Sequence, residues 1–173
     1  DKTAPIVTGV ENGKHYNSDV TISFNEGTAT LNDSEFISGS TVTEEGNYEL
    51  IVKDNALNET TINFVIDKLA PTGTVTANPT TLTNGDVELV LETNEDVIIT
   101  NAASSNVYQY EEGNLRKYAV KRTVNGNFTF KFKDQAGNIG EITYNVENID
   151  KESPVVTDIT YSPNLISGYS KED

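Results

Sequence analysis

The segment Gly46–Ile66, GNYELIVKDNALNETTINFVI, returns later in the chain as Gly126–Val146, GNFTFKFKDQAGNIGEITYNV. Both stretches share the Gly-Asn opening, a central D-x-A-x-N segment and the alternation of apolar side chains on either side of it. Self-similarity at this scale is the sequence signature of repeated structural units. The chain therefore contains two homologous modules.

A second repeated motif marks the ends of these modules. Asp1–Pro5 reads DKTAP, Asp67–Pro71 reads DKLAP and Asp150–Pro154 reads DKESP. Proline fixes its own φ and biases the preceding residue toward extended backbone, so this motif is typical of a short linker that limits bending. The sequence predicts three parts: one domain (module one), a second domain (module two), and a linker with the incomplete start of a third repeat, at residues 1–66, 67–149 and 150–173.

Apolar and polar residues alternate on both sides of each D-x-A-x-N segment. A period of two indicates antiparallel strands joined by a hairpin, each with one face in a core. Further short strands are expected at 6–10, 20–24, 28–31 and 41–43, and at 73–77, 87–91, 97–100 and 107–110. Because no helical period interrupts this pattern, the predicted fold class is all-β, with two tandem antiparallel β-sandwiches in an elongated arrangement. Module two also has room for an extra or extended hairpin, built from 107–110 and 118–122.

The composition excludes several functional classes. The 173 residues carry 27 acidic and 12 basic side chains, for a net charge of −15, which argues against nucleic-acid and anionic-lipid partners. No apolar run approaches the roughly 20 residues that cross a bilayer. With no Cys and a single His, the chain lacks the residues for thiolate chemistry, disulfides or multi-histidine metal sites. We expect no catalytic residues and no enzyme activity, and we place His15 in an exposed turn between the first two strands.

Taken together, the D-K-T-A-P opening, the G-N-[YF] strand entry, the D-x-A-G-N hairpin and a closing strand before I-D-K resemble the bacterial Ig-like repeats of large secreted and cell-surface proteins. The resemblance covers residues 1–149 as two whole modules and 150–173 as a partial third. It implies a secreted, cell-wall-associated protein. The chain departs from the family at Leu57, where Gly is usual, and at Phe128, which replaces the tyrosine of the tyrosine corner that Tyr48 retains.

Oxygen-bearing side chains gather in loops that an Ig-type sandwich brings to one end. The N-terminus of such a domain lies beside its B–C and F–G loops, so these loops of module two are expected to face the linker from module one. Hard oxygen ligands of this kind suit Ca²⁺, and the family resemblance also implies calcium at domain junctions. The candidate ligands are Asp67, Asn94, Glu95, Asp96, Asp134 and Asn138. A weaker candidate set occupies the N-terminal end of module one: Asp1, Asn25, Glu26, Asp54 and Asn58.

A competing interpretation needs no metal. Asp and Asn are favoured in turns because their side chains bond nearby backbone groups, and Gly137 supplies a positive φ. The aromatic residues also have two interpretations. Tyr108, Tyr110 and Tyr118 lie on the extra hairpin, where they form either a carbohydrate-stacking platform or ordinary cross-strand pairs.

The function predicted from the sequence is a non-catalytic spacer that extends and stiffens a larger protein, with neighbouring Ig-like domains of the same chain as partners. Two alternatives remain open: an adhesive module that recognises a host protein, a glycan or a cell-wall ligand, and a module of a self-assembling surface layer. The partial third repeat cannot bury a core alone. Tyr161–Asp173 is therefore predicted to be poorly ordered unless it pairs with an edge strand or a second molecule.

Overall fold

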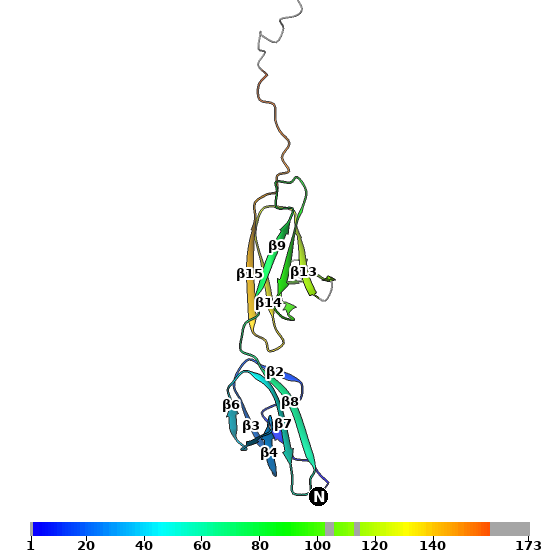
Figure 1. Cartoon of the computed structure of the whole chain (residues 1–173). Helices are drawn as coiled ribbons and strands as arrows, with labels where there is room; N and C mark the ends of the chain where they lie inside the picture. The colour runs from blue at the N-terminus through cyan, green and yellow to red at the C-terminus, as the bar shows by residue number, and fades with distance from the viewer. Residues whose placement is uncertain (1, 103–105, 113–114, 160–173) are drawn as a thin grey trace, which may run out of the picture.

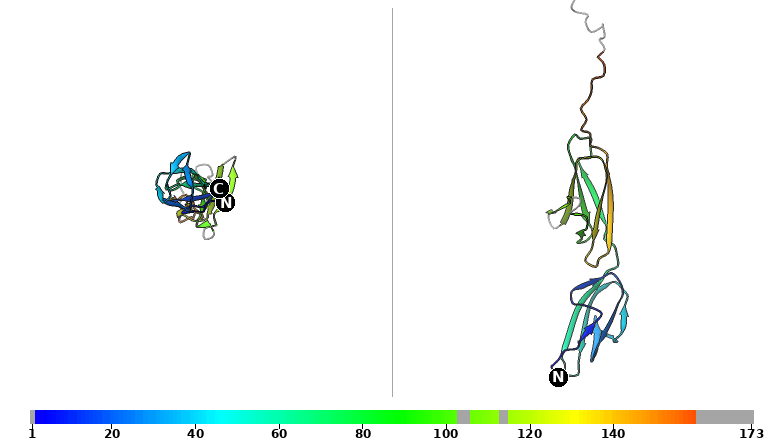
Figure 2. Two further views of the ribbon diagram at one scale, coloured as in Figure 1. Left: turned by 90° about the horizontal axis from the view of Figure 1, so that it is seen from below. Right: turned by 180° about the vertical axis from the view of Figure 1, so that it is seen from behind.

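A computed structural model describes residues 2–102, 106–112 and 115–159 of the chain. Strands dominate its secondary structure, which confirms the predicted all-β fold class. The two modules lie end to end, and a view along the long axis places one over the other (Figures 1 and 2). No helical segment of the described residues combines the length and the apolarity that crossing a membrane requires. The prediction for Tyr161–Asp173 falls outside the described residues.

Module one consists of two sheets. The first has the order β1-β3-β6, and the second has the order β2-β8-β7-β4-β5. Neighbouring strands are antiparallel except β2 and β8, which are parallel. The strands are β1 (Val7–Thr8), β2 (Lys14–Tyr16), β3 (Val20–Phe24), β4 (Thr28–Leu31), β5 (Ser34–Phe36), β6 (Ser40–Val42), β7 (Gly46–Lys53) and β8 (Glu59–Ile66).

Module two distributes its strands differently. One sheet has the order β12-β13-β10-β9, and the other has the order β11-β14-β15; all pairs within them are antiparallel. The strands are β9 (Gly73–Asn78), β10 (Val87–Thr93), β11 (Ile98–Ile99), β12 (Tyr108–Glu112), β13 (Leu115–Arg122), β14 (Gly126–Lys133) and β15 (Ile139–Val146). The expected extra hairpin is β12 and β13, and it adds its outer strand to the sheet opposite the closing hairpin β14–β15.

Each module has its own hydrophobic core, lined by the inward phase of its strands. In module one Leu50 and Val52 from β7 pack with Phe64 and Ile66 from β8 against Ile22 of the facing sheet. In module two the fully buried residues include Leu89, Leu91, Val120, Phe130 and Phe132. The period-two pattern of the repeated stretch therefore identifies core positions correctly, because each residue that points inward on a strand is followed by one that points to solvent.

Two predicted details are wrong or incomplete. His15 does not lie in an exposed turn: it is half-buried in β2, where it pairs with Val65 of β8. Strand β2 is three residues long and pairs with the end of β8, the last strand of the module. It leaves no local signal in the sequence, because the contacts that stabilise it are remote in sequence. Leu57 keeps the turn geometry despite replacing glycine, with a φ of 66° against 96° at Gly137.

Candidate metal centre at the module junction

The linker is fixed first to module one. The Asp67 amide donates to the Tyr16 carbonyl at 2.9 Å, and the Leu69 amide donates to the Asp67 Oδ1 at 3.1 Å, which closes a tight turn. The Lys68 ammonium group lies 2.5 Å from Asp19 Oδ1 and 2.6 Å from the Thr43 carbonyl oxygen. These contacts hold Asp67 at the rim of module one, facing module two.

The D-x-A-G-N turn of module two meets this linker. Asp134 is 4% exposed, and its Oδ1 accepts hydrogen bonds from the amides of Gly137 and Asn138. The Asn138 side-chain nitrogen then donates to both Asp134 Oδ2 and the Asp67 carbonyl oxygen, each at 2.8 Å. Asn138 is thus a bridge that joins the turn of module two to the backbone of the linker.

The B–C loop supplies the third side of the junction. Asn94 is bound at both backbone and side chain to Thr72, the first residue after the linker: its amide donates to the Thr72 carbonyl, and its Oδ1 accepts from the Thr72 amide at 2.7 Å. The following residue, Glu95, is half-buried and directed at the linker. Because Asn94 fixes the loop, the direction of Glu95 is set by the fold.

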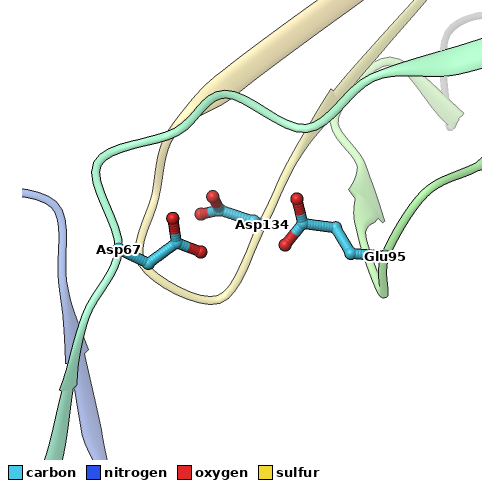
Figure 3. Close-up of side chains that lie close together, drawn as sticks. All are labelled: Asp67, Glu95 and Asp134. Carbon is cyan, nitrogen blue, oxygen red and sulfur yellow. The ribbon is translucent and has the colours of Figure 1, made fainter. Parts of the chain in front are cut away.

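Three carboxylates converge as a result. One oxygen each from Asp67, Glu95 and Asp134 lies within 4.8 Å of the others, and Figure 3 shows the three groups turned toward a common space. Burial and the nearby charges of Asp67 and Asp134 raise the pKa of Glu95. No basic side chain forms a salt bridge with these three acids among the described residues. The arrangement concentrates negative charge and offers hard oxygen ligands, which is what a divalent cation such as Ca²⁺ requires.

Three of the six residues assigned to this site from sequence have other partners. Asn94 holds the Thr72 amide through its side-chain oxygen, and Asn138 presents its nitrogen to Asp67 and Asp134. Asp96 is turned away, 3.2 Å from Arg116 on β13. Sequence spacing places all six at one end of the module, but it does not say which end of an amide faces the acids.

Sequence reasoning also missed residues at the junction. A cavity of about 220 Å³ is bounded by His15 and Val65 from module one, and by Gln135 with the neighbouring acids from module two. His15 reaches this cavity because β2 ends at the junction end of module one. The distal nitrogen of Asn17 also lies close to the turn at Gly137.

The weaker candidate set at the N-terminal end of module one has the same local construction. Asp54 is buried and accepts hydrogen bonds from the amide and the side-chain nitrogen of Asn58, and these bonds lower the pKa of Asp54. Asn25 accepts from the Ile6 amide at 2.7 Å, and its nitrogen faces Glu26. Asp1 lies outside the described residues.

The tyrosines of the extra hairpin do not form one platform. Tyr118 is 3% exposed in the core of module two, and its hydroxyl donates to the Val97 carbonyl. Tyr108 pairs with Ala119, the neighbour of Tyr118, so it projects from the opposite face, where its hydroxyl bonds Glu88. Tyr110 lies beside Tyr108, with ring centroids 6.2 Å apart and ring planes tilted by 34°. Because side chains alternate across a strand, the three tyrosines do not share one face, and the arrangement fits the cross-strand interpretation better than a three-ring carbohydrate platform.

No protein-family model matches this sequence. A segment of the chain is 44% identical over 75 residues to the outer cell wall protein of Brevibacillus brevis. The match covers 39% of this chain and 8% of that protein, so the chain corresponds to a small part of this relative. This is a local similarity between one stretch of the chain and a cell-wall protein.

Proposed function

We propose that this chain is a non-catalytic structural spacer, part of a larger bacterial cell-wall or cell-surface protein, which it extends and stiffens. The observation that carries the proposal is the linker, which is bonded on both sides. Lys68 ties it to Asp19 and Thr43 of module one, while Asn138 ties its Asp67 carbonyl to module two and Asn94 holds Thr72, the residue directly after it. A linker held in this way restricts the angle between modules, whereas a free linker would leave a flexible chain.

The similarity to an outer cell wall protein supports the cell-surface assignment. An adhesive role for the tyrosine hairpin has less support, because Tyr118 is committed to the core and only Tyr108 and Tyr110 remain on the outer face.

We further propose that Ca²⁺ stiffens the junction by binding Asp67, Glu95 and Asp134. A calcium ion takes six to eight oxygen ligands, so carbonyl oxygens and water would complete the shell. Without a cation the three carboxylates repel one another across the junction, and with it they become a link between linker, B–C loop and F–G turn.

Spin labels test the spacer function directly, because the chain has no cysteine of its own. Thr61→Cys on β8 and Glu141→Cys on β15 place one exposed label in each module at equivalent positions of the repeat. We expect one narrow distance distribution in double electron–electron resonance, and a broader one after Lys68→Ala. A broad distribution in the otherwise unaltered chain would refute the spacer.

Calcium is tested by thermal unfolding in chelator and in millimolar CaCl₂. We expect Ca²⁺ to raise the Tm, and Glu95→Gln to reduce that rise. Glu35→Gln, on exposed strand β5, is the matched control that should leave it intact. Equal Tm values with and without calcium would remove the metal from the proposal and leave the hydrogen-bonded linker in place.

A further inference from the structure

The far end of module two repeats three of the contacts that module one makes with its linker, although the bonds of Lys68 to Thr43 and Glu45 have no counterpart at Lys151 among the described residues. The Asp150 amide donates to the Thr83 carbonyl at 2.8 Å, just as the Asp67 amide donates to the Tyr16 carbonyl at 2.9 Å. The Glu152 amide donates to the Asp150 Oδ1 at 3.0 Å and closes the same tight turn that Asp67 closes. The second linker therefore leaves module two along the path that the first takes from module one.

The ion pair of the linker lysine is also repeated. Lys151 lies 2.9 Å from Asp86, as Lys68 lies beside Asp19. Each aspartate is the last residue of a matching segment, Asn17-Ser18-Asp19 or Asn84-Gly85-Asp86. Each segment directly precedes the first core valine of β3 or β10. The rim that receives module two is thus present a second time, on module two itself.

The surface that docks against this rim is also present twice in the chain. At the junction it comprises the Asn94-Glu95 loop and the Asp134 to Asn138 turn of module two. Module one carries the same surface at its N-terminal end, with near-identical hydrogen bonds. Asn58 donates to Asp54 Oδ2 at 2.7 Å against 2.8 Å for Asn138 and Asp134, and Asn25 donates to Glu26 at 3.3 Å against 3.4 Å for Asn94 and Glu95.

The described residues after the second linker carry apolar side chains at the positions of a first strand. Pro5 and Pro71 are buried by the module that each precedes, whereas Pro154 is exposed. Val156 and Ile159 stand at the positions of Val7 and Val10 relative to the linker proline, and both of the latter pack in the core of module one. Val156 is 74% exposed and Ile159 is 70% exposed. Apolar side chains in this pattern fit a first strand that requires the rest of a sandwich to cover it.

We propose that the C-terminal end of module two, formed by Asn84, Asp86, Asp150 and Lys151, is a docking face for a third Ig-like module, which it holds in the orientation that module two has on module one. The partner it fits carries an Asn-Glu B–C loop and an Asp-x-x-x-Asn turn at its N-terminal end. This inference rests on the proposed spacer function and adds that the rim of each module sets the geometry of the next junction.

A fusion protein tests the inference: residues 1–154 followed directly by a second copy of residues 6–66. In this fusion Asp150–Pro154 replaces Asp1–Pro5 as the linker of the appended copy. One label pair, Thr61→Cys with Glu141→Cys, reports the existing junction. A second pair, Glu141→Cys with Thr61→Cys of the appended copy, reports the new one. Because the labels occupy equivalent positions in consecutive modules, equal junctions give distance distributions with the same mean and width.

We expect the two distributions to coincide. Lys151→Ala should broaden only the new junction, and Lys68→Ala only the existing one, so each variant is the control for the other. A narrow first distribution with a broad or displaced second one overturns the docking face while the spacer function stands. A broad first distribution overturns both. A second fusion, with residues 72–149 after Pro154 and labels at both copies of Glu141, repeats the test should the appended copy of module one not fold.

Discussion

Module one adds an outer strand to the sheet that contains its closing hairpin β7–β8. Module two adds its outer strand to the sheet opposite its closing hairpin β14–β15. The two modules agree from Gly46 and Gly126 onward but differ in the middle, between β4 and β6 in module one and between β11 and β13 in module two. In module one the outer strand β5 pairs with β4. In module two the outer strand β12 pairs with β13. The repeated hairpin and the junction loops are therefore compatible with either edge.

The segment that follows β4 in module one and β11 in module two decides between the two arrangements. Asn32 and Asp33 have φ values of 47° and 63°, the conformation of a two-residue hairpin turn, so the chain returns beside β4. In module two the Asn101 side chain holds the backbone of β14 at Thr129 and Lys131. The chain beyond it pairs with the other sheet. The closing hairpin therefore fixes the core and the junction, while one turn selects the edge.

The largest difference in stability between the two modules is expected where the linker proline meets the closing strand. In module one Thr60 Oγ1 donates to the Pro5 carbonyl at 2.6 Å, whereas in module two Gly140 allows the Pro71 carbonyl to approach the strand itself. A methyl group at Gly140 would overlap with that carbonyl and with the Phe132 ring. We expect Gly140→Ala to destabilise module two by about 1–3 kcal/mol in urea unfolding followed by amide NMR signals of each module.

Thr60→Ala is the matched change in module one. It removes one hydrogen bond and adds no atoms, so we expect a loss of about 1 kcal/mol there. An equal loss for both variants would show that the close approach at Gly140 carries no special constraint.

A smaller effect is expected at the tyrosine corner. The Tyr48 hydroxyl donates to the Glu44 carbonyl at 2.8 Å, and module two has Phe128 at the same place in the repeat. We expect Tyr48→Phe to cost module one about 1 kcal/mol in thermal unfolding. Phe128→Tyr should bring no gain, because this ring is already packed edge-on against Phe130 and beneath the Arg122 guanidinium group. A gain from Phe128→Tyr would mean that the two corners are interchangeable.

The smallest effect concerns the junction charge and depends on pH. The pKa of Glu95 is higher in the folded protein than the usual value of about 4.3, so its ionised form is the disfavoured one. The resulting destabilisation is fully present above the folded pKa, and it disappears as the pH falls below the unfolded pKa. In chelator we expect Glu95→Gln to stabilise the protein at pH 7, by less than about 1 kcal/mol because the side chain keeps contact with water.

The same comparison of Glu95→Gln with the unaltered chain at pH 3.5 should show no difference in Tm. Glu26→Gln provides the parallel measurement at the N-terminal end of module one. Stabilisation of the Glu95→Gln variant that is equal at both pH values would contradict an electrostatic origin.

Sequence periodicity predicted the parts of the molecule that depend on local alternation. The closing hairpins, their core residues and the common end of Asp67, Glu95 and Asp134 all follow from the repeat and the direction of the strands. Strand β2 was missed because its partner β8 lies far away in the sequence, and β5 was missed because the two-residue turn at Asn32 and Asp33 that returns the chain beside β4 was not recognised. The orientation of Asn138 and the ion pair of Asp96 were not predictable, because they depend on which side chains the fold brings opposite them.

The parallel pair β2–β8 makes the two modules unequal under tension. Pulling on the chain ends shears Lys14–Tyr16 along Phe64–Ile66, so several backbone hydrogen bonds must break together. Module two has only one parallel bridge at this place among its described residues, Thr83 with Ile149. We therefore expect module two to yield first in single-molecule pulling, with module one giving way at higher force. Such an array would lengthen in steps under load and keep its stronger modules folded until the weaker ones had opened.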